Sequence, residues 1–82
     1  MQFTACYKKI ESGYMGQLLE WPQVITEGKN LNECRELLID AACEMAFVYK
    51  EDGLKIPQVS IMIEPLSIPV KPVEEAKIIN VS

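Results

Sequence analysis

The sequence predicts an α+β fold in the order β-β-β-α-β, with a mixed sheet covered by one helix on one face and an extended C-terminal arm. Three observations support this prediction: apolar residues alternate near the start, a twenty-residue stretch in the middle lacks Gly and Pro, and prolines punctuate the end. A chain of 82 residues makes one small domain with a marginal core. Since 49% of the residues are apolar, we expect the chain to fold.

The first two strands are predicted as a hairpin. Residues 3–10 alternate between apolar and polar side chains, which is the period of a half-buried strand. Ser12 and Gly13 then supply turn residues before a second strand, residues 14–19.

A corner and a third strand follow. Pro22 has no N–H to donate to a sheet, so the chain must bend after Trp21. Residues 24–26 are short and β-branched, which fits an edge strand.

The helix is predicted over residues 31–50. Asn30 can cap its N-terminus, and Glu33 stands three residues later, as in a capping box. Asp52 and Gly53 end the helix. At about 100° per residue, one apolar face is expected to pack on the sheet. That face consists of Cys34, Leu37, Leu38, Ala41, Met45, Val48 and Tyr49.

The fourth strand is predicted over residues 59–64, after a break at Ile56 and Pro57. Its apolar residues alternate with Ser60, Met62 and Glu64. A strand that follows a long helix normally returns to the same sheet by a right-handed crossover. We therefore expect it beside the first strand, which gives the sheet order 3-2-1-4.

Residues 65–82 do not fit a closed domain, so we divide the chain into a domain, residues 1–64, and a C-terminal arm. Prolines at positions 65, 69 and 72 confine the arm to sheet edges, although residues 66–68, 70 and 78–81 are β-prone. We interpret the arm as a segment that pairs with another subunit. The alternative is a frayed terminus.

The helix also carries two further stripes. Four acidic residues at spacings of three and four form an acidic ridge: Glu33, Glu36, Asp40 and Glu44. Three apolar residues at spacings of four lie away from the main apolar face: Ile39, Cys43 and Phe47. The ridge can be read as a solvated face, and the apolar stripe as incidental exposure. We favour an oligomer interface, at least a dimer, formed by that stripe together with Leu66, Ile68 and Val70 of the arm.

The net charge and the absence of His argue against several classes of function. A net charge of −4 disfavours direct binding of nucleic acid and suits a basic protein partner. No His is present, and the carboxylates of the predicted strands, Glu20, Glu27 and Glu64, are widely spaced. We therefore expect no enzyme activity, no metal site and no cofactor.

The cysteines and the distribution of apolar residues indicate the cellular compartment in which the protein is expected. The chain has three cysteines, Cys6, Cys34 and Cys43, with no Cys-x-x-Cys spacing, and it shows neither a signal peptide nor a long apolar span. We expect free, buried thiols in a cytoplasmic protein that does not enter the membrane.

The segment from residue 11 to residue 33 resembles the HicB family of antitoxins. The matching pattern is a Gly-Tyr strand, a Pro-containing corner, a Thr-x-Gly exit and a capped helix. In this sequence it is formed by Gly13, Tyr14, Pro22, Thr26, Gly28, Leu31 and Glu33. The chain departs from the family at Gln23 and Val24, where Gly-Cys is usual.

The resemblance implies a partial ribonuclease-H-like fold and an antitoxin that neutralises a HicA-like toxin, a small basic protein that cleaves messenger RNA. We expect Glu20 and Trp21, at the corner, to join the acidic ridge in contacting that partner. Many HicB-like proteins also carry a C-terminal DNA-binding module, which we do not expect here because the arm has only Lys71 and Lys77. The alternative is an orphan HicB-like scaffold or binding module that forms homo-oligomers without a toxin.

Overall fold

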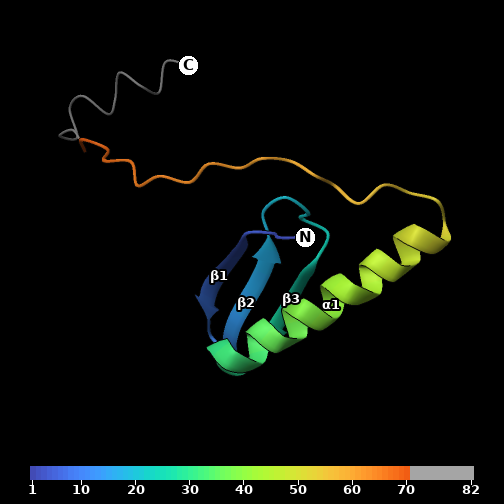
Figure 1. Ribbon diagram of the computed structural model, residues 1–82. Helices are drawn as coiled ribbons and strands as arrows, with labels where there is room; N and C mark the ends of the chain where they lie inside the picture. Colours follow the sequence, from blue (N-terminus) through green and yellow to red (C-terminus); the bar gives the residue numbers. More distant parts are fainter. Residues whose placement is uncertain (71–82) are drawn as a thin grey trace, which may run out of the picture.

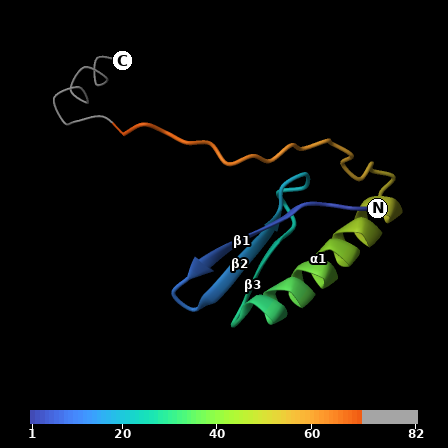
Figure 2. The same cartoon turned by 60° about the vertical axis from the view of Figure 1, so that its left-hand side comes forward.

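The computed structural model describes residues 1–70 and shows three strands followed by one helix in that range (Figure 1). The elements are β1 (Ala5–Ile10), β2 (Gly13–Leu18), β3 (Ile25–Gly28) and α1 (Leu31–Glu51). The strands form an antiparallel sheet in the order β1-β2-β3. Figures 1 and 2 both show α1 along one face of this sheet. The α+β class, the first three strands and the single covering helix are therefore confirmed.

The β1–β2 hairpin turns at Glu11 and Ser12, between the paired residues Ile10 and Gly13. Gly13 has a φ of +147°, a conformation that residues with a Cβ rarely adopt. The predicted hairpin is confirmed, with Gly13 as the first residue of β2 rather than as part of the turn.

The corner between β2 and β3 is closed by three hydrogen bonds. The Leu18 N–H donates to the Val24 carbonyl (3.1 Å), and the Val24 N–H donates to the Trp21 carbonyl (2.9 Å). The Gln17 side-chain amide donates to the Pro22 carbonyl (2.8 Å). These bonds turn the chain within six residues and bring β3 beside β2.

Both ends of α1 have the predicted caps. The Asn30 side chain accepts from the Glu33 N–H (2.8 Å), while the Glu33 carboxylate accepts from the Lys29 N–H (2.6 Å), one residue before the cap. At the other end, Gly53 has a φ of +72° and its N–H donates to Lys50, while the Leu54 N–H donates to Tyr49. This pair of bonds is a Schellman motif, which satisfies the last carbonyls of the helix.

The core lies between α1 and the sheet, and its buried apolar side chains are few. They are Leu18, Trp21, Val24, Cys34 and Leu38. Phe3, Tyr7 and Ile56 pack against them from outside α1, and Ala41, Ala42, Met45, Ala46 and Tyr49 pack from α1 itself. Gly28 allows this close approach, because a Cβ at Gly28 would lie 2.5 Å from the Cys34 backbone nitrogen.

The face that α1 buries is rotated from the predicted one. Leu37 and Val48 are 39% and 49% exposed, whereas Ala42 and Ala46 pack against the core. Leu37 and Val48 were thus wrongly predicted as core residues. The reason is that β3 is a short edge strand, so the flank of α1 that lies beyond it has no strand to cover it. Within residues 1–70, no helix is both long and apolar enough to span a membrane.

The predicted fourth strand is wrong for this structure. Residues 59–64 belong to a run without regular secondary structure that reaches Val70, and the described sheet ends at β1. The period-two pattern specified an extended backbone, but a strand also needs a neighbour for its ladder of hydrogen bonds. Instead of turning along β1, the chain crosses the end of the sheet and continues past it (Figures 1 and 2).

Candidate functional site

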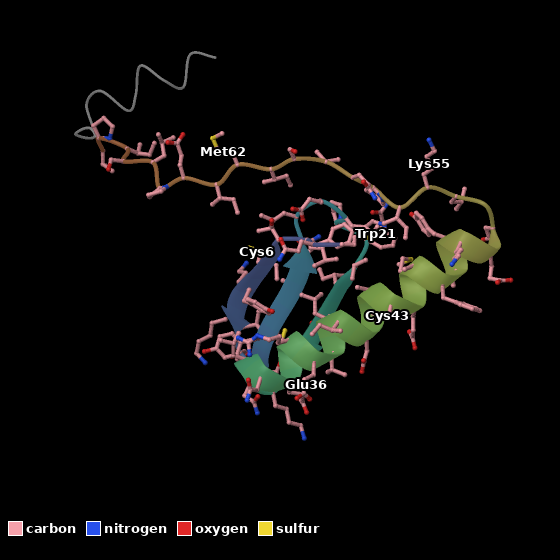
Figure 3. The ribbon with its side chains drawn as sticks, in the orientation of Figure 1. Cys6, Trp21, Glu36, Cys43, Lys55 and Met62 are labelled. Atoms are coloured by element: carbon pink, nitrogen blue, oxygen red, sulfur yellow. The ribbon has the colours of Figure 1, made fainter. Side chains whose placement is uncertain are left out.

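The outer side of α1 bears an acidic surface, which we define as Glu36, Asp40 and Glu44. All three side chains are exposed, and Figure 3 shows Glu36 on the side of the helix that faces away from the sheet. The nearest basic residue in sequence, Arg35, donates to the Asn32 side chain (2.8 Å) rather than to one of these acids. The carboxylates are therefore accessible to a partner.

Glu33, the fourth acid of the predicted ridge, has a different role. Its carboxylate accepts from the Lys29 N–H, and its side chain is only partly exposed. A carboxylate in this position also interacts favourably with the positive end of the helix dipole. Glu33 therefore belongs to the helix cap, at the edge of the acidic surface.

Glu20 is engaged within the chain. Its two carboxylate oxygens accept from the Thr4 backbone N–H (2.7 Å) and the Thr4 hydroxyl (2.6 Å). The hydroxyl bond first, and the N–H bond second, lower the pKa of Glu20 below its ordinary value, since both favour the ionised form. Glu20 thus fixes the N-terminal segment to the corner, and it lies on a different element from the acidic surface.

Trp21, which was predicted to contact the partner, is 1% exposed and is a core residue. Its indole packs between Phe3 and Tyr49, with ring centroids 5.8 and 4.9 Å away. The prediction is corrected because the corner turns the side chain inward, under the end of α1. A corner position in the sequence does not reveal that direction.

An apolar groove of about 420 Å³ lies between β1 and one flank of α1. Phe3, Ala5 and Tyr7 line one wall, and Ile39, Ala42 and Cys43 line the other. Ile39 and Cys43 are exposed, in agreement with their predicted position outside the main apolar face. Phe47 is 65% exposed and does not line the groove, so the predicted stripe is divided between the groove and the outer side of the helix.

The groove itself was not predicted from the sequence. The alternation of Phe3, Ala5 and Tyr7 indicated one apolar face of the first strand, which was a usable signal. A fourth strand was expected beside the first strand, at the edge where the groove now opens. The groove is open because residues 59–64 lie elsewhere.

The cysteines are all free thiols; Cys34 is buried, whereas Cys6 and Cys43 are exposed, contrary to the expectation of three buried thiols. Glu20, Glu27 and Glu64 lie on the corner, on β3 and in the extended run, respectively. Across residues 1–70, no three His, Cys, Asp or Glu side chains are grouped so that they could hold a metal ion.

The residues predicted for an oligomer interface in the arm are exposed as far as the structure describes them. Leu66, Ile68 and Val70 are 74%, 67% and 92% exposed. Residues 71–82, which include the β-prone stretch 78–81, lie outside the described residues.

Comparison with known proteins gives no relative: no family model, no curated protein and no solved structure matches this chain.

Proposed function

We propose that this chain is a HicB-type antitoxin that neutralises a HicA-like toxin, a small basic protein that cleaves messenger RNA, by covering its active site. The observation that supports the proposal best is the exposed acidic surface of Glu36, Asp40 and Glu44 on one rigid helix. An antitoxin of this kind needs only to bind, so it requires no catalytic group, metal or cofactor of its own.

The charge of α1 supports a basic partner. The helix contains five acidic and two basic residues, a net charge of −3 out of −4 for the whole chain. Like charges on one surface attract an oppositely charged protein over about a Debye length, roughly 8 Å at physiological salt. The gain is expected mainly in the association rate, since exposed ion pairs add little to affinity.

The finer topology is part of the same proposal. A β-β-β-α unit with strand order β1-β2-β3 matches the first four elements of the partial ribonuclease-H-like arrangement that the HicB resemblance implies. Gly13 and Gly28, two glycines of the resemblance, occupy positions where a Cβ would collide with backbone atoms. This fold therefore favours glycine at both positions.

The experiment is a charge reversal on the acidic surface. Glu36→Lys with Asp40→Lys is compared with Glu11→Lys with Glu27→Lys, which changes the net charge equally at two exposed positions outside α1. The probe is a small basic protein encoded by a neighbouring gene, whose toxicity is measured in cells and whose binding is measured at several salt concentrations. The helix variant should lose at least tenfold in association rate at low salt and show a flatter salt dependence, while the control stays close to wild type. Full neutralisation by the helix variant would exclude this surface.

The second candidate is a homo-oligomeric HicB-like scaffold without a toxin. The apolar groove and the exposed apolar residues after α1 favour it, because a partner of the same sequence could cover them. The two candidates differ in one observation: a neighbouring gene for a small basic protein whose toxicity this chain suppresses supports the antitoxin, and the absence of such a gene supports the scaffold.

A further inference from the structure

Both outer edges of the sheet lack a partner strand in the described part of the chain, and β1, with six residues against four in β3, offers the longer one. In the order β1-β2-β3, β1 is hydrogen-bonded to β2 alone. Its other edge presents backbone N–H and C=O groups that form a template for another strand. Lys8 and Lys9, in the second half of β1, are residues of the kind that disfavours such pairing, whereas its first half, residues 5–7, carries no charge.

The apolar groove lies directly beside this edge. Ala5 and Tyr7 of β1 line it together with Ile39 and Cys43 of α1. Alternate side chains of a strand point to the same face of a sheet. A strand added outside β1 would therefore place every second side chain over the groove, between β1 and the exposed flank of α1.

The chain contains a segment that fits this position, which we call the extended segment, residues 57–70. Residues 59, 61 and 63 are apolar and alternate with Ser60, Met62 and Glu64. Eight large apolar side chains between Leu54 and Val70 are exposed, whereas only five apolar residues within residues 1–70 are buried. So much exposed apolar surface is unusual for a monomer and typical of a surface that another chain covers.

We propose that the extended segment of one copy pairs with the edge of β1 in a second copy, and that the exchange is reciprocal. Val59, Ile61 and Ile63 of each copy then lie over the apolar groove of the other. Glu64, the only charged residue in 59–70, comes to the edge that carries Lys8 and Lys9, so the charges are complementary. The donor and acceptor surfaces are on the same chain, so two copies close with twofold symmetry.

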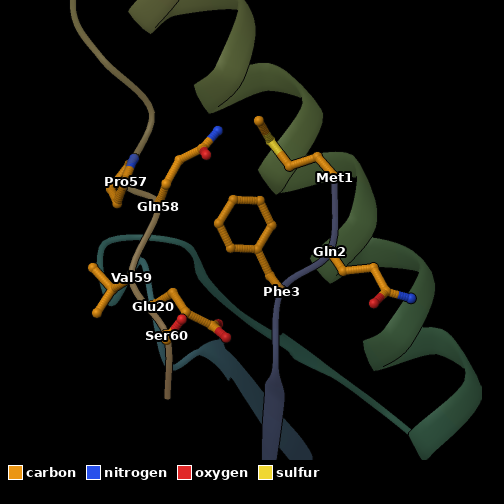
Figure 4. A pocket seen from close by; sticks show the side chains of 8 residues that line it. All are labelled: Met1, Gln2, Phe3, Glu20, Pro57, Gln58, Val59 and Ser60. Carbon is orange, nitrogen blue, oxygen red and sulfur yellow. The ribbon is translucent and has the colours of Figure 1, made fainter.

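The path of the extended segment favours a second copy over the same copy. Pro57, Gln58, Val59 and Ser60 lie opposite Met1, Gln2 and Phe3 at the end of the sheet (Figure 4). Beyond this point the segment runs away from its own sheet on the β1 side, in both views (Figures 1 and 2).

The length of the segment points the same way. β1 has six residues, whereas the segment has twelve from Val59 to Val70, with apolar residues at 59, 61 and 63 and then, after a change of phase at Pro65, at 66, 68 and 70. If the segment paired with its own β1, about half of it, including Leu66 and Ile68, would remain uncovered. In a reciprocal dimer the two segments pass each other, so the remaining halves can cover one another.

The first test is the oligomeric state of the full chain at micromolar concentration, measured by sedimentation equilibrium. We expect a dimer for the wild type and for Ser60→Asp with Met62→Asp, whose side chains point away from the groove. Ile61→Asp with Ile63→Asp adds the same charge on the groove side and should weaken dimerisation at least 100-fold. A monomeric wild type, or equal effects of the two pairs of substitutions, would overturn the proposal.

The second test identifies which copy supplies the segment. One tagged chain carries Cys at position 59, 61 or 63 in turn, together with Cys6→Ser and Cys43→Ser. A second, untagged chain keeps Cys43 and carries Cys6→Ser. After mixing and air oxidation, a disulfide between tagged and untagged chains is expected for at least one position.

A disulfide that forms only within one chain carrying both cysteines would mean that the segment folds back on its own sheet, which refutes the exchange. None of these substitutions touches the acidic surface, so this inference and the antitoxin proposal can fail separately.

Discussion

Thr4 and Glu20, sixteen residues apart, are joined by two hydrogen bonds in which both Glu20 oxygens accept, at 2.6 and 2.7 Å. A third bond runs beside them, from the Leu19 N–H to the Thr4 carbonyl (2.9 Å). Together they fasten the N-terminal residues to the corner that carries Trp21. The carboxylate thus contributes to the fold.

The first prediction concerns pH. Because the hydrogen bonds from Thr4 lower the pKa of Glu20 in the folded state, its contribution to stability is complete above the unfolded pKa of about 4.5. That contribution is lost as the pH falls through the lowered folded value. Glu20→Gln should therefore be less stable than wild type at pH 7, and the difference should shrink below about pH 4. Urea denaturation between pH 2.5 and 7 measures this difference.

Thr4→Val serves as the matched variant, since it removes the hydroxyl and keeps the backbone N–H. Its pH dependence should lie between those of wild type and Glu20→Gln. If the stabilities of wild type and Glu20→Gln differ by the same amount at every pH, the carboxylate does not have this role.

The second prediction compares two glycines beneath α1. A Cβ at Gly28 would lie 2.5 and 2.7 Å from the backbone nitrogen and Cα of Cys34, so the helix itself would have to move. A Cβ at Gly16 would lie 3.0 Å from the Cys34 sulfur and 3.2 Å from the Tyr7 ring, which are side-chain atoms with more freedom. Gly28→Ala should cost about 1–3 kcal/mol, and Gly16→Ala clearly less. Urea midpoints at equal m-value measure both, and the reverse order would contradict this packing.

The elements that could be predicted from the sequence are those specified locally. The hairpin has its turn residues beside it, and α1 has Asn30 before it and Gly53 after it, so neither depends on distant contacts. The fourth strand differs because its ladder partner is far away in the sequence or on another chain. The period-two pattern of residues 59–64 indicates an extended backbone and shows which of its sides is apolar. It does not show which strand lies beside it.

In the candidate site, too, some positions could be predicted from local spacing and others depend on distant contacts. Glu36 and Asp40 were predicted to be exposed from helical spacing alone, and they are exposed. The roles of Glu20 and Trp21 depend on contacts with Thr4 and Tyr49, which are 16 and 28 residues away. No local pattern indicates contacts at that separation, so Trp21 was wrongly predicted as a surface residue and the bonds from Thr4 to Glu20 were not foreseen.

The third prediction concerns the N-terminal cap of α1. Asn30→Ala removes the acceptor for the Glu33 N–H and should destabilise the protein by about 1 kcal/mol. Asn32→Ala, in the exposed first turn of α1, should cost less, because Asn32 accepts only from the Arg35 side chain. Thermal unfolding measures both variants. Equal melting temperatures for the two would argue against the cap.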